Sequence, residues 1–352
     1  MKPDLHAKFR LVCNAVLILT AITTVMAVLA YAAFRLSPWP SVLLIRYAFH
    51  EGALKAIASI APYVPKDVST HWNIRYGSEK DARLDVFAPA HAPASLPAVV
   101  WVHGGGFVAG SRSDLSDYLK VLAARGFVVV AIDYTLAPAV RFPEPVRQTN
   151  AALTYVVANA KRFGIDTARL FLAGDSAGAQ IAAQSALIIS DPVYARRMSI
   201  KPGVSRRALR GLVLFCGGPY DPSIMRLEGP FADFMRTVLW SYLGTRDADA
   251  LSVQRLAVVP YITSMYPPTF ISVGNGDPLA AQSVALADAL SLRNVVVDAL
   301  FFPEHYRPSL GHEYQLMLST QEARMALDRY VSFLQRQAGR RDSAGVVLTL
   351  RR

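Results

Sequence analysis

A serine between two glycines follows an apolar run in the middle of the chain. Ser176 is the centre of a G-x-S-x-G pattern, which comes after the apolar residues 171–173 and before a helical pattern at 177–190. A serine at such a strand-to-helix turn stands exposed above the edge of a sheet, and the helix N-terminus behind it favours developing negative charge. The spacing therefore predicts a nucleophilic serine.

A glycine-rich loop follows a second apolar run. Residues 98–102 are apolar, and His103 and three glycines come directly after them. Residues without a Cβ allow backbone N–H groups to approach a developing oxyanion closely. We predict Gly105, Gly106 and Ala177 as the donors. A phosphate-binding loop is disfavoured, because no Lys-Ser/Thr pair follows and the dinucleotide-binding spacing is missing.

A carboxylate and an imidazole are needed to activate the serine. Asp277 follows the apolar run 269–273 in a glycine-containing turn, which is where the acid of a triad must lie to hold an imidazole. Asp133 and Asp221 are alternatives, but the first follows an earlier strand and the second falls in a predicted cap. Asp277 is therefore the predicted acid.

The base must come from the last part of the chain. His305 and His312 are the two histidines after the last predicted strand, and a helical pattern begins soon after His312. The order Ser176, Asp277, His312 is the order of nucleophile, acid and base in α/β hydrolases. We therefore predict His312 as the base and interpret His305 as a loop residue.

Short apolar runs alternate with helical patterns from about residue 71 onward, which is typical of a mainly parallel sheet with helices on both faces. About eight strands are predicted near 72–76, 84–87, 98–102, 127–132, 170–173, 212–215, 269–273 and 296–301. Helices are predicted at 115–124, 145–162, 177–190, 280–292 and 320–336.

These motifs, in this order, resemble the hormone-sensitive lipase-like family of α/β hydrolases over roughly residues 70–336. The resemblance implies an α/β-hydrolase fold with a helical cap, and an esterase or lipase activity that needs no cofactor. It rests on His103-Gly104-Gly105-Gly106, Asp133-Tyr134-Thr135-Leu136-Ala137-Pro138, Gly174-Asp175-Ser176-Ala177-Gly178, Asp277-Pro278-Leu279 and His312.

Two positions depart from the family pattern. Thr135 and Ala139 replace an arginine and a glutamate that usually follow Asp-Tyr, so an ion-pair network is missing or rebuilt. Where the family often has His-Gly-Phe, this chain has His312, Glu313 and Tyr314. These changes affect the fine placement of side chains and leave the predicted triad intact.

The predicted reaction is acyl transfer from a small-molecule ester of short or medium chain length, through an acyl-enzyme that water hydrolyses. Phe107, Phe142 and Trp240 are candidates for the substrate pocket. An amidase or aryl formamidase would use the same triad, so that alternative stays open. A non-catalytic receptor on this scaffold is disfavoured, because all three triad residues are retained.

The N-terminus contains a segment long enough to cross a membrane. From Leu11 to Phe34 the chain has 24 residues without a charge, which as a helix reach about 36 Å against roughly 30 Å of hydrocarbon. Lys2, Lys8 and Arg10 precede it, which favours a single-pass anchor with the catalytic domain on the non-cytoplasmic side. A cleaved signal peptide is the alternative, because the pattern Ala30-Tyr31-Ala32 suits a signal peptidase.

We predict four parts of the chain: an anchor or signal peptide at 1–36, an amphipathic cap segment at 37–70, a catalytic domain at 71–336 with a cap insertion at about 217–266, and a basic tail at 337–352. In the cap segment, polar residues at 46, 50, 51, 55 and 59 form one stripe of a helix over 42–61. This helix could lie on a bilayer or pack on the hydrolase as part of a lid.

Composition excludes some other classes of protein. The chain is 53% hydrophobic and its formal net charge is +11, but its basic residues are spread out and no nucleic-acid-binding motif is present. A basic surface near an anionic bilayer is the favoured interpretation. Cys13 lies in the apolar N-terminal run and Cys216 ends an apolar run, so we expect no disulfide between them and no metal cluster.

Overall fold

The computed structural model describes residues 5–92, 94–221, 223–224 and 229–339. Within these residues, eight strands form one sheet in the order β1-β2-β4-β3-β5-β6-β7-β8. The strands are β1 (Val68–Arg75), β2 (Arg83–Pro89), β3 (Leu96–Val102), β4 (Val128–Ile132), β5 (Ile165–Asp175), β6 (Leu209–Phe215), β7 (Thr269–Val273) and β8 (Val297–Phe301).

The sheet is mainly parallel. β1 pairs with β2 and β2 with β4 in antiparallel register, whereas β4, β3, β5, β6, β7 and β8 all pair in parallel. Every predicted strand overlaps an observed one, and the predicted α/β-hydrolase fold is confirmed. Parallel strands need helical crossovers, which cover both faces and explain why their sequences are continuously apolar.

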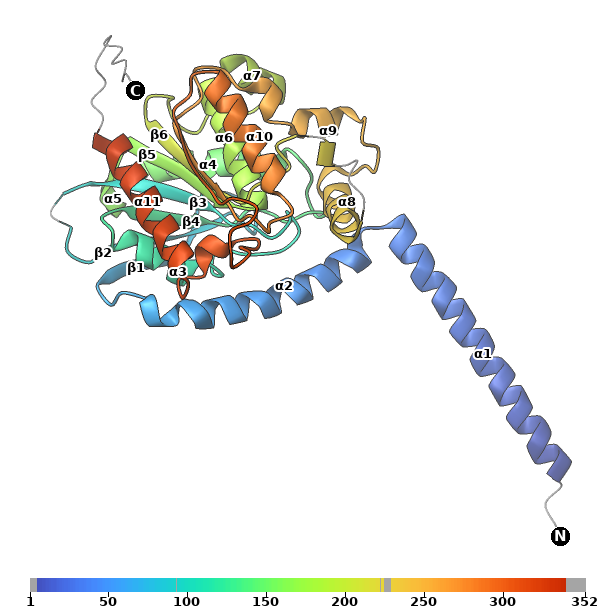
Figure 1. Cartoon of the computed structure of the whole chain (residues 1–352). Helices are drawn as coiled ribbons and strands as arrows, with labels where there is room; N and C mark the ends of the chain where they lie inside the picture. The colour runs from blue at the N-terminus through green and yellow to red at the C-terminus, as the bar shows by residue number, and fades with distance from the viewer. Residues whose placement is uncertain (1–4, 93, 222, 225–228, 340–352) are drawn as a thin grey trace.

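Helices cover the sheet on two sides (Figure 1). Along β3, Val100 belongs to a core that includes buried residues of α4, α6 and α10, whereas the next residue, Trp101, belongs to a core that includes buried residues of α3 and α11. Alternate side chains of one strand thus enter two separate cores. These helices are α3 (Ser116–Ala123), α4 (Glu144–Ala158), α6 (Ala177–Ser190), α10 (Ala280–Leu292) and α11 (Gln321–Gly339).

Two helical regions differ from the prediction. The helix predicted over 145–162 is divided into α4 and α5 (Ala160–Phe163) at Asn159, whose side-chain amide donates to the Tyr155 carbonyl and competes with the helical pattern. The unpredicted α7 (Pro192–Met198) is capped by Asp191, whose side chain accepts from the N–H of Val193 at 2.7 Å.

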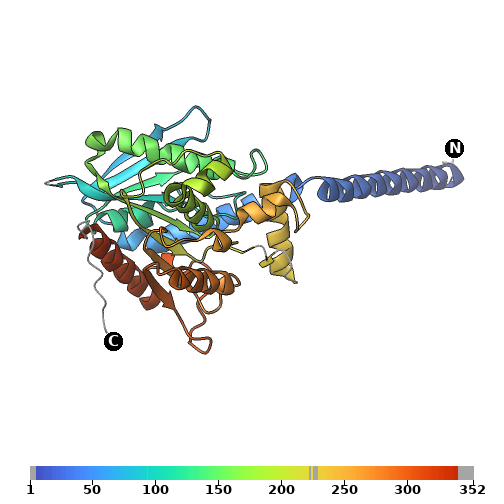
Figure 2. The ribbon, with the colours of Figure 1, turned by 90° about the horizontal axis from the view of Figure 1, so that it is seen from above.

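The N-terminal helix α1 (Leu5–Leu36) projects away from the rest of the molecule (Figures 1 and 2). Of the described helices, it alone is long and apolar enough to cross a membrane: within Lys8–Leu36, a stretch of 18 residues has a mean hydropathy of 2.3, and none of that stretch is buried. A membrane anchor and a signal sequence both have these properties. Lys2 lies outside the described residues.

Helix α2 (Trp39–Ile60) runs along the catalytic domain, and one residue of its polar stripe points inward, whereas His50 and Glu51 are exposed. Arg46 points into the domain, where its Nε donates to the Val108 carbonyl at 2.7 Å and Nη2 to the Ala137 carbonyl at 3.2 Å. Leu43, Leu44 and Tyr47 are exposed instead. The two hydrogen bonds to backbone carbonyls compensate the Arg46 guanidinium for its lost contact with water. The helical pattern of the sequence alone does not reveal these two acceptors.

The segment around 217–266 also forms helices, α8 (Pro230–Leu243) and α9 (Leu251–Leu256), and the 3₁₀ turn η3 (Val259–Tyr261). Helix α8 contacts α2, where the rings of Phe49 and Phe234 stack with centroids 6.4 Å apart. The two regions predicted as cap segments therefore touch each other. The predicted tail begins inside α11, and residues 340–352 lie outside the described residues. Two further 3₁₀ turns are η1 (Ala61–Tyr63) and η4 (Tyr314–Leu316).

Candidate active site

Ser176 occupies the sharp turn between β5 and α6. Its φ of 50° and ψ of −120° are strained for a residue with a side chain, and its N–H donates to the Phe215 carbonyl at 2.8 Å. A Cβ on Gly178 would overlap the carbonyl oxygen of Val102, and one on Gly174 would overlap the backbone of Gly178. The flanking glycines therefore let the turn pack against the end of β3 and hold the serine at the sheet edge.

Asp277 and His312 lie beside this serine. Asp277 is buried beyond the end of β7, where its Oδ1 accepts from the N–H of Leu279 at 2.8 Å. His312 lies in the segment between β8 and α11; its Nδ1 is 2.9 Å from Asp277 Oδ2, and its Nε2 is 3.0 Å from Ser176 Oγ. Three residues that are far apart in the sequence thus form one hydrogen-bonded relay.

The alternative acids and base lie in other surroundings. Asp133 forms an ion pair with Arg112, and Asp221 accepts from the N–H of Ser223 at 2.9 Å. His305 is exposed in the loop after β8. Within the described part of the chain, none of the three is hydrogen-bonded to Ser176.

The surroundings of His312 favour its charged form. Burial lowers the pKa of an imidazole, but Cys216, the hydrogen bond to Asp277 and the charge of Glu313 together outweigh burial, so the pKa of His312 lies well above its ordinary value. A raised pKa suits a base that must accept a proton from the serine and stabilise the resulting imidazolium.

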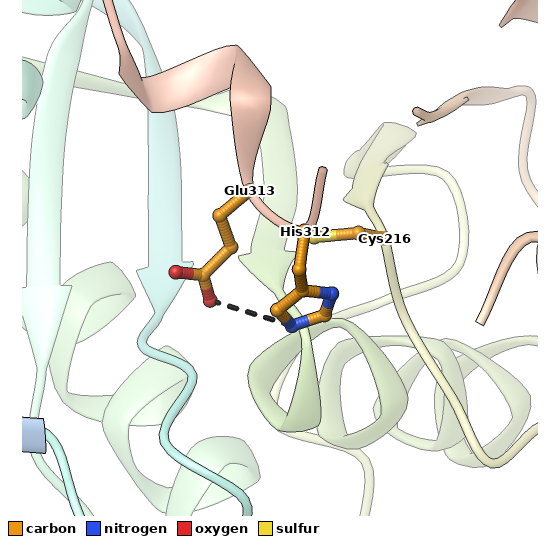
Figure 3. Close-up of side chains that lie close together, drawn as sticks. All are labelled: Cys216, His312 and Glu313. Carbon is orange, nitrogen blue, oxygen red and sulfur yellow. Dashed lines mark ion pairs between the residues drawn. The ribbon is translucent and has the colours of Figure 1, made fainter. Parts of the chain in front are cut away.

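Cys216, His312 and Glu313 also form the one group of possible metal ligands found in the described residues, with ligand atoms within 4.8 Å of one another (Figure 3). Both ring nitrogens of His312 already have partners in Ser176 and Asp277. Burial raises the pKa of the Cys216 thiol to about 11, which disfavours the thiolate that metals bind. The arrangement suits proton transfer better than metal binding.

The glycine-rich loop lies next to the N-terminus of α6. Within the described residues, the backbone N–H groups of Gly105, Gly106 and Ala177 have no hydrogen-bond acceptor. Gly105 has a φ of +105°, and a Cβ there would overlap the carbonyl of Ala109. His103 anchors the start of the loop by stacking on Tyr134, with ring centroids 4.4 Å apart. The three predicted donors are thus available to an incoming oxygen.

Asp175, immediately before the nucleophile, ties the loop to β3, a role that the sequence did not reveal. Its carboxylate accepts from Trp101 Nε1 at 2.7 Å and from the N–H of Gly104 at 2.8 Å. Burial and, after it, the charge of Glu313 raise the pKa of Asp175 to about 7. The sequence signal for this role is the position of Asp175 in G-D-S-A-G, at the end of a buried strand. A carboxylate buried there needs hydrogen-bond donors close by.

At Thr135, which departs from the family pattern, hydrogen bonds between neutral groups replace the expected ion pair. The N–H of Thr135 donates to Gln148 Oε1 at 2.8 Å, and Gln148 Nε2 donates back to Thr135 Oγ1 at 3.0 Å. A separate ion-pair network joins Arg112 to Asp133 and Asp85. Both sets of bonds fix the loops that follow β4 and the glycine-rich segment.

A cavity of about 400 Å³ opens beside His312, within the size range of small-molecule sites. Helix α2 forms one wall through small residues and Phe49, and the glycine-rich loop forms another. Phe107, Phe142 and Trp240 are not among its lining residues: Phe107 and Phe142 pack on Tyr242, and Trp240 contacts Arg246. The lining is Ala48, Phe49, Gly52, Ala53, His103, Gly104, Gly105, Gly110, Ser111, Asp114, Leu115, Asp175, His312, Glu313 and Leu316.

A mainly parallel sheet covered by helices, with a Ser-His-Asp relay at the carboxyl ends of its strands, defines an α/β hydrolase. The chain belongs to the α/β-hydrolase-fold family, whose model matches residues 99–307. The resemblance found in the motifs is confirmed by this match.

Several esterases are similar to this chain. Esterase LipC of Mycobacterium tuberculosis is 29% identical over 257 aligned residues, and the match covers 69% of this chain and 60% of that protein. The hyperthermophilic esterase of the archaeon Pyrobaculum calidifontis matches with a TM-score of 0.66 and 26% identity, over 84% of this chain and 91% of that one. Esterase B of Lactobacillus rhamnosis has a TM-score of 0.75 at 22% identity, over 85% and 96% of the two chains, and shows likeness of fold.

Proposed function

We propose that this protein is a serine carboxylesterase that hydrolyses short- to medium-chain carboxylic esters. The single observation that carries the proposal is the relay from Ser176 Oγ through His312 to Asp277, with distances of 3.0 and 2.9 Å. The similarity to esterases supports the bond type, and the cavity of about 400 Å³ supports a substrate of modest size.

The reaction begins when His312 Nε2 accepts the proton of Ser176 and the serine oxygen attacks the ester carbonyl. Asp277 holds the imidazole in the tautomer with a proton on Nδ1 and stabilises the imidazolium. The N–H groups of Gly105, Gly106 and Ala177 donate to the oxyanion. His312 then protonates the departing alcohol, and the same base activates the water that hydrolyses the acyl-enzyme.

A series of p-nitrophenyl esters from acetate to laurate, with the full chain in detergent, tests this proposal. We expect the short and medium esters to be cleaved fastest and Ser176→Ala to lose at least about 10⁴-fold in kcat. Circular dichroism checks that the variant folds. Hydrolysis that survives in Ser176→Ala would contradict the assignment, and faster cleavage of aryl formamides than of matched esters would identify a formamidase.

We further propose that α1 anchors the protein in a membrane by a single span, with the catalytic domain on the non-cytoplasmic side. The apolar run of Lys8–Leu36 and the basic Lys8 and Arg10 before its uncharged part support this topology. Leu43, Leu44 and Tyr47 of α2, which follow the span in the sequence, are also exposed apolar residues.

Alkaline extraction of membranes and N-terminal sequencing of the mature chain test this anchor. An intact N-terminus in the alkali-resistant fraction is expected. A mature chain that begins near residue 33 in the soluble fraction would identify a cleaved signal peptide instead, and protease accessibility from each side reports the topology.

A further inference from the structure

Glu313, the residue directly after the proposed base, has an unusual backbone conformation. Its φ of 59° lies in the left-handed region, which glycine adopts freely and which a residue with a side chain adopts at a cost. The Glu313 side chain is only 34% exposed and lines the cavity beside the triad. A strained residue whose side chain lines the cavity beside His312 suggests a functional role for that side chain.

The carboxylate of Glu313 reaches the reacting atoms. Glu313 Oε1 lies 3.9 Å from His312 Nε2, and it lies against Gly104 at the start of the glycine-rich loop. Figure 3 shows this carboxylate directed at the imidazole. In the proposed reaction, Nε2 delivers a proton to the oxygen of the departing alcohol, so the alcohol part of the substrate must lie next to Glu313.

Apart from His312, this carboxylate has no basic partner in the described part of the chain. The described lining of the cavity includes no Lys or Arg, although the chain has a formal net charge of +11. The other two carboxylates of the lining have their own donors: Asp175 accepts from Trp101 and Gly104, and Asp114 accepts from Ser111. Glu313 contacts His312, which must be neutral when it acts as a base.

An anionic group in a half-enclosed cavity attracts a cationic substrate and repels an anionic one. Phe49 of α2 lines the same cavity and provides an aromatic surface, and aromatic rings together with carboxylates bind ammonium groups. A positive charge on the alcohol would also offset the negative charge of the Glu313 carboxylate, which would otherwise repel the oxyanion that forms nearby.

We propose that Glu313 is a specificity-determining residue that selects esters of amino alcohols, whose ammonium group lies beside its carboxylate in the cavity. This inference rests on the proposed esterase function and names the class of alcohol that the same site accepts. Glu313 acts on the substrate and takes no part in the proton relay.

Two esters of the same shape test the proposal: butyrylcholine, which carries a quaternary ammonium, and 3,3-dimethylbutyl butyrate, in which carbon replaces the nitrogen. With the full chain in detergent, titration of released butyric acid gives kcat/KM for both. We expect the native protein to prefer the choline ester by about tenfold, and Glu313→Gln to reduce that ratio by about tenfold. Any effect of the substitution on the basicity of His312 applies to both esters and therefore cancels in the ratio of their kcat/KM values.

Two further variants serve as controls. Glu313→Gly removes the charge and also relieves the left-handed strain, so it must lose the preference as Glu313→Gln does. Asp288→Asn removes a charge from the exposed face of α10 and must keep the preference. An equal ratio in the native protein and both Glu313 variants would overturn the proposal.

The proposed function and this inference fail in different ways. If p-nitrophenyl butyrate is cleaved without any preference for the choline ester, the inference alone is wrong. If no ester is cleaved, the shift of the unfolding temperature by choline against 3,3-dimethylbutanol still measures recognition of the cation. A shift by choline that Glu313→Gln abolishes would support the site, and equal shifts by both alcohols would reject it.

Discussion

The edge of the sheet that holds the triad and the helices that cover it are built in different ways. At the edge, Ser176, Asp277 and the glycine-rich loop each follow the end of a strand, so the backbone itself fixes their positions. The covering helices α2 and α8 are held by side chains such as Arg46, Val42 and the stacked pair Phe49 and Phe234.

This difference separates the chemistry from the choice of substrate. A nucleophile fixed by strand ends and buried hydrogen bonds is insensitive to changes in distant segments, whereas a cavity wall made of packed side chains changes with each substitution. We therefore expect variants at the edge to change kcat by orders of magnitude, and variants in the covering helices to change stability and KM.

The largest effect after loss of the nucleophile is expected at the acid. Asp277→Asn keeps the shape of the side chain but favours the wrong tautomer of His312, so kcat should fall by about 10⁴-fold with KM nearly unchanged. Steady-state kinetics with p-nitrophenyl butyrate measure this loss. A fall of less than about tenfold would show that another residue orients the imidazole.

A pair of glycine variants tests whether the loop backbone is as rigid as the edge requires. Gly105→Ala places a Cβ against the carbonyl of Ala109, so we expect the oxyanion donors to move and kcat to fall by about 10²- to 10³-fold. Gly126 has a similar φ of +94° but open space around it, and Gly126→Ala should retain its activity. Equal activity of the two variants would contradict the proposed role of the loop.

For the covering helices, the expected effects are smaller. Arg46→Met leaves the carbonyls of Val108 and Ala137 without their donor, so the free energy of unfolding should fall by about 1–3 kcal/mol while kcat changes only a few-fold. Chemical denaturation measures the difference. Arg293→Met, an exposed arginine after α10, is the matched control and should change stability by less than about 0.5 kcal/mol.

The smallest effect is a shift in pH dependence. His312 must be neutral to act as a base, and the charge of Glu313 contributes to its raised pKa, so activity should rise with pH through a midpoint above the ordinary range. Glu313→Gln removes that charge, and the midpoint of kcat/KM for a neutral ester should move to lower pH. A midpoint that moves upward would contradict this account of the electrostatics.

The same contrast explains how far the sequence alone could lead. The eight strands and the convergence of Ser176, Asp277 and His312 were predictable. A short apolar run predicts a strand, and a glycine-containing motif after it predicts the turn that carries a functional residue. The inward direction of Arg46 and the place of Phe49 were not predictable, since both depend on contacts between α2 and segments distant in sequence. Phe107 was assigned to the pocket but packs on Tyr242, because an aromatic residue beside a motif gives no direction for its ring.

The joint between the first two helices consists of Ser37 and Pro38 alone, since α1 ends at Leu36 and α2 begins at Trp39. With so short a joint, a protein anchored by α1 cannot tumble freely above the membrane. The tilt of α1 in the membrane would then set the orientation of the catalytic domain. The protein would meet molecules dissolved in the lipid by diffusion in two dimensions.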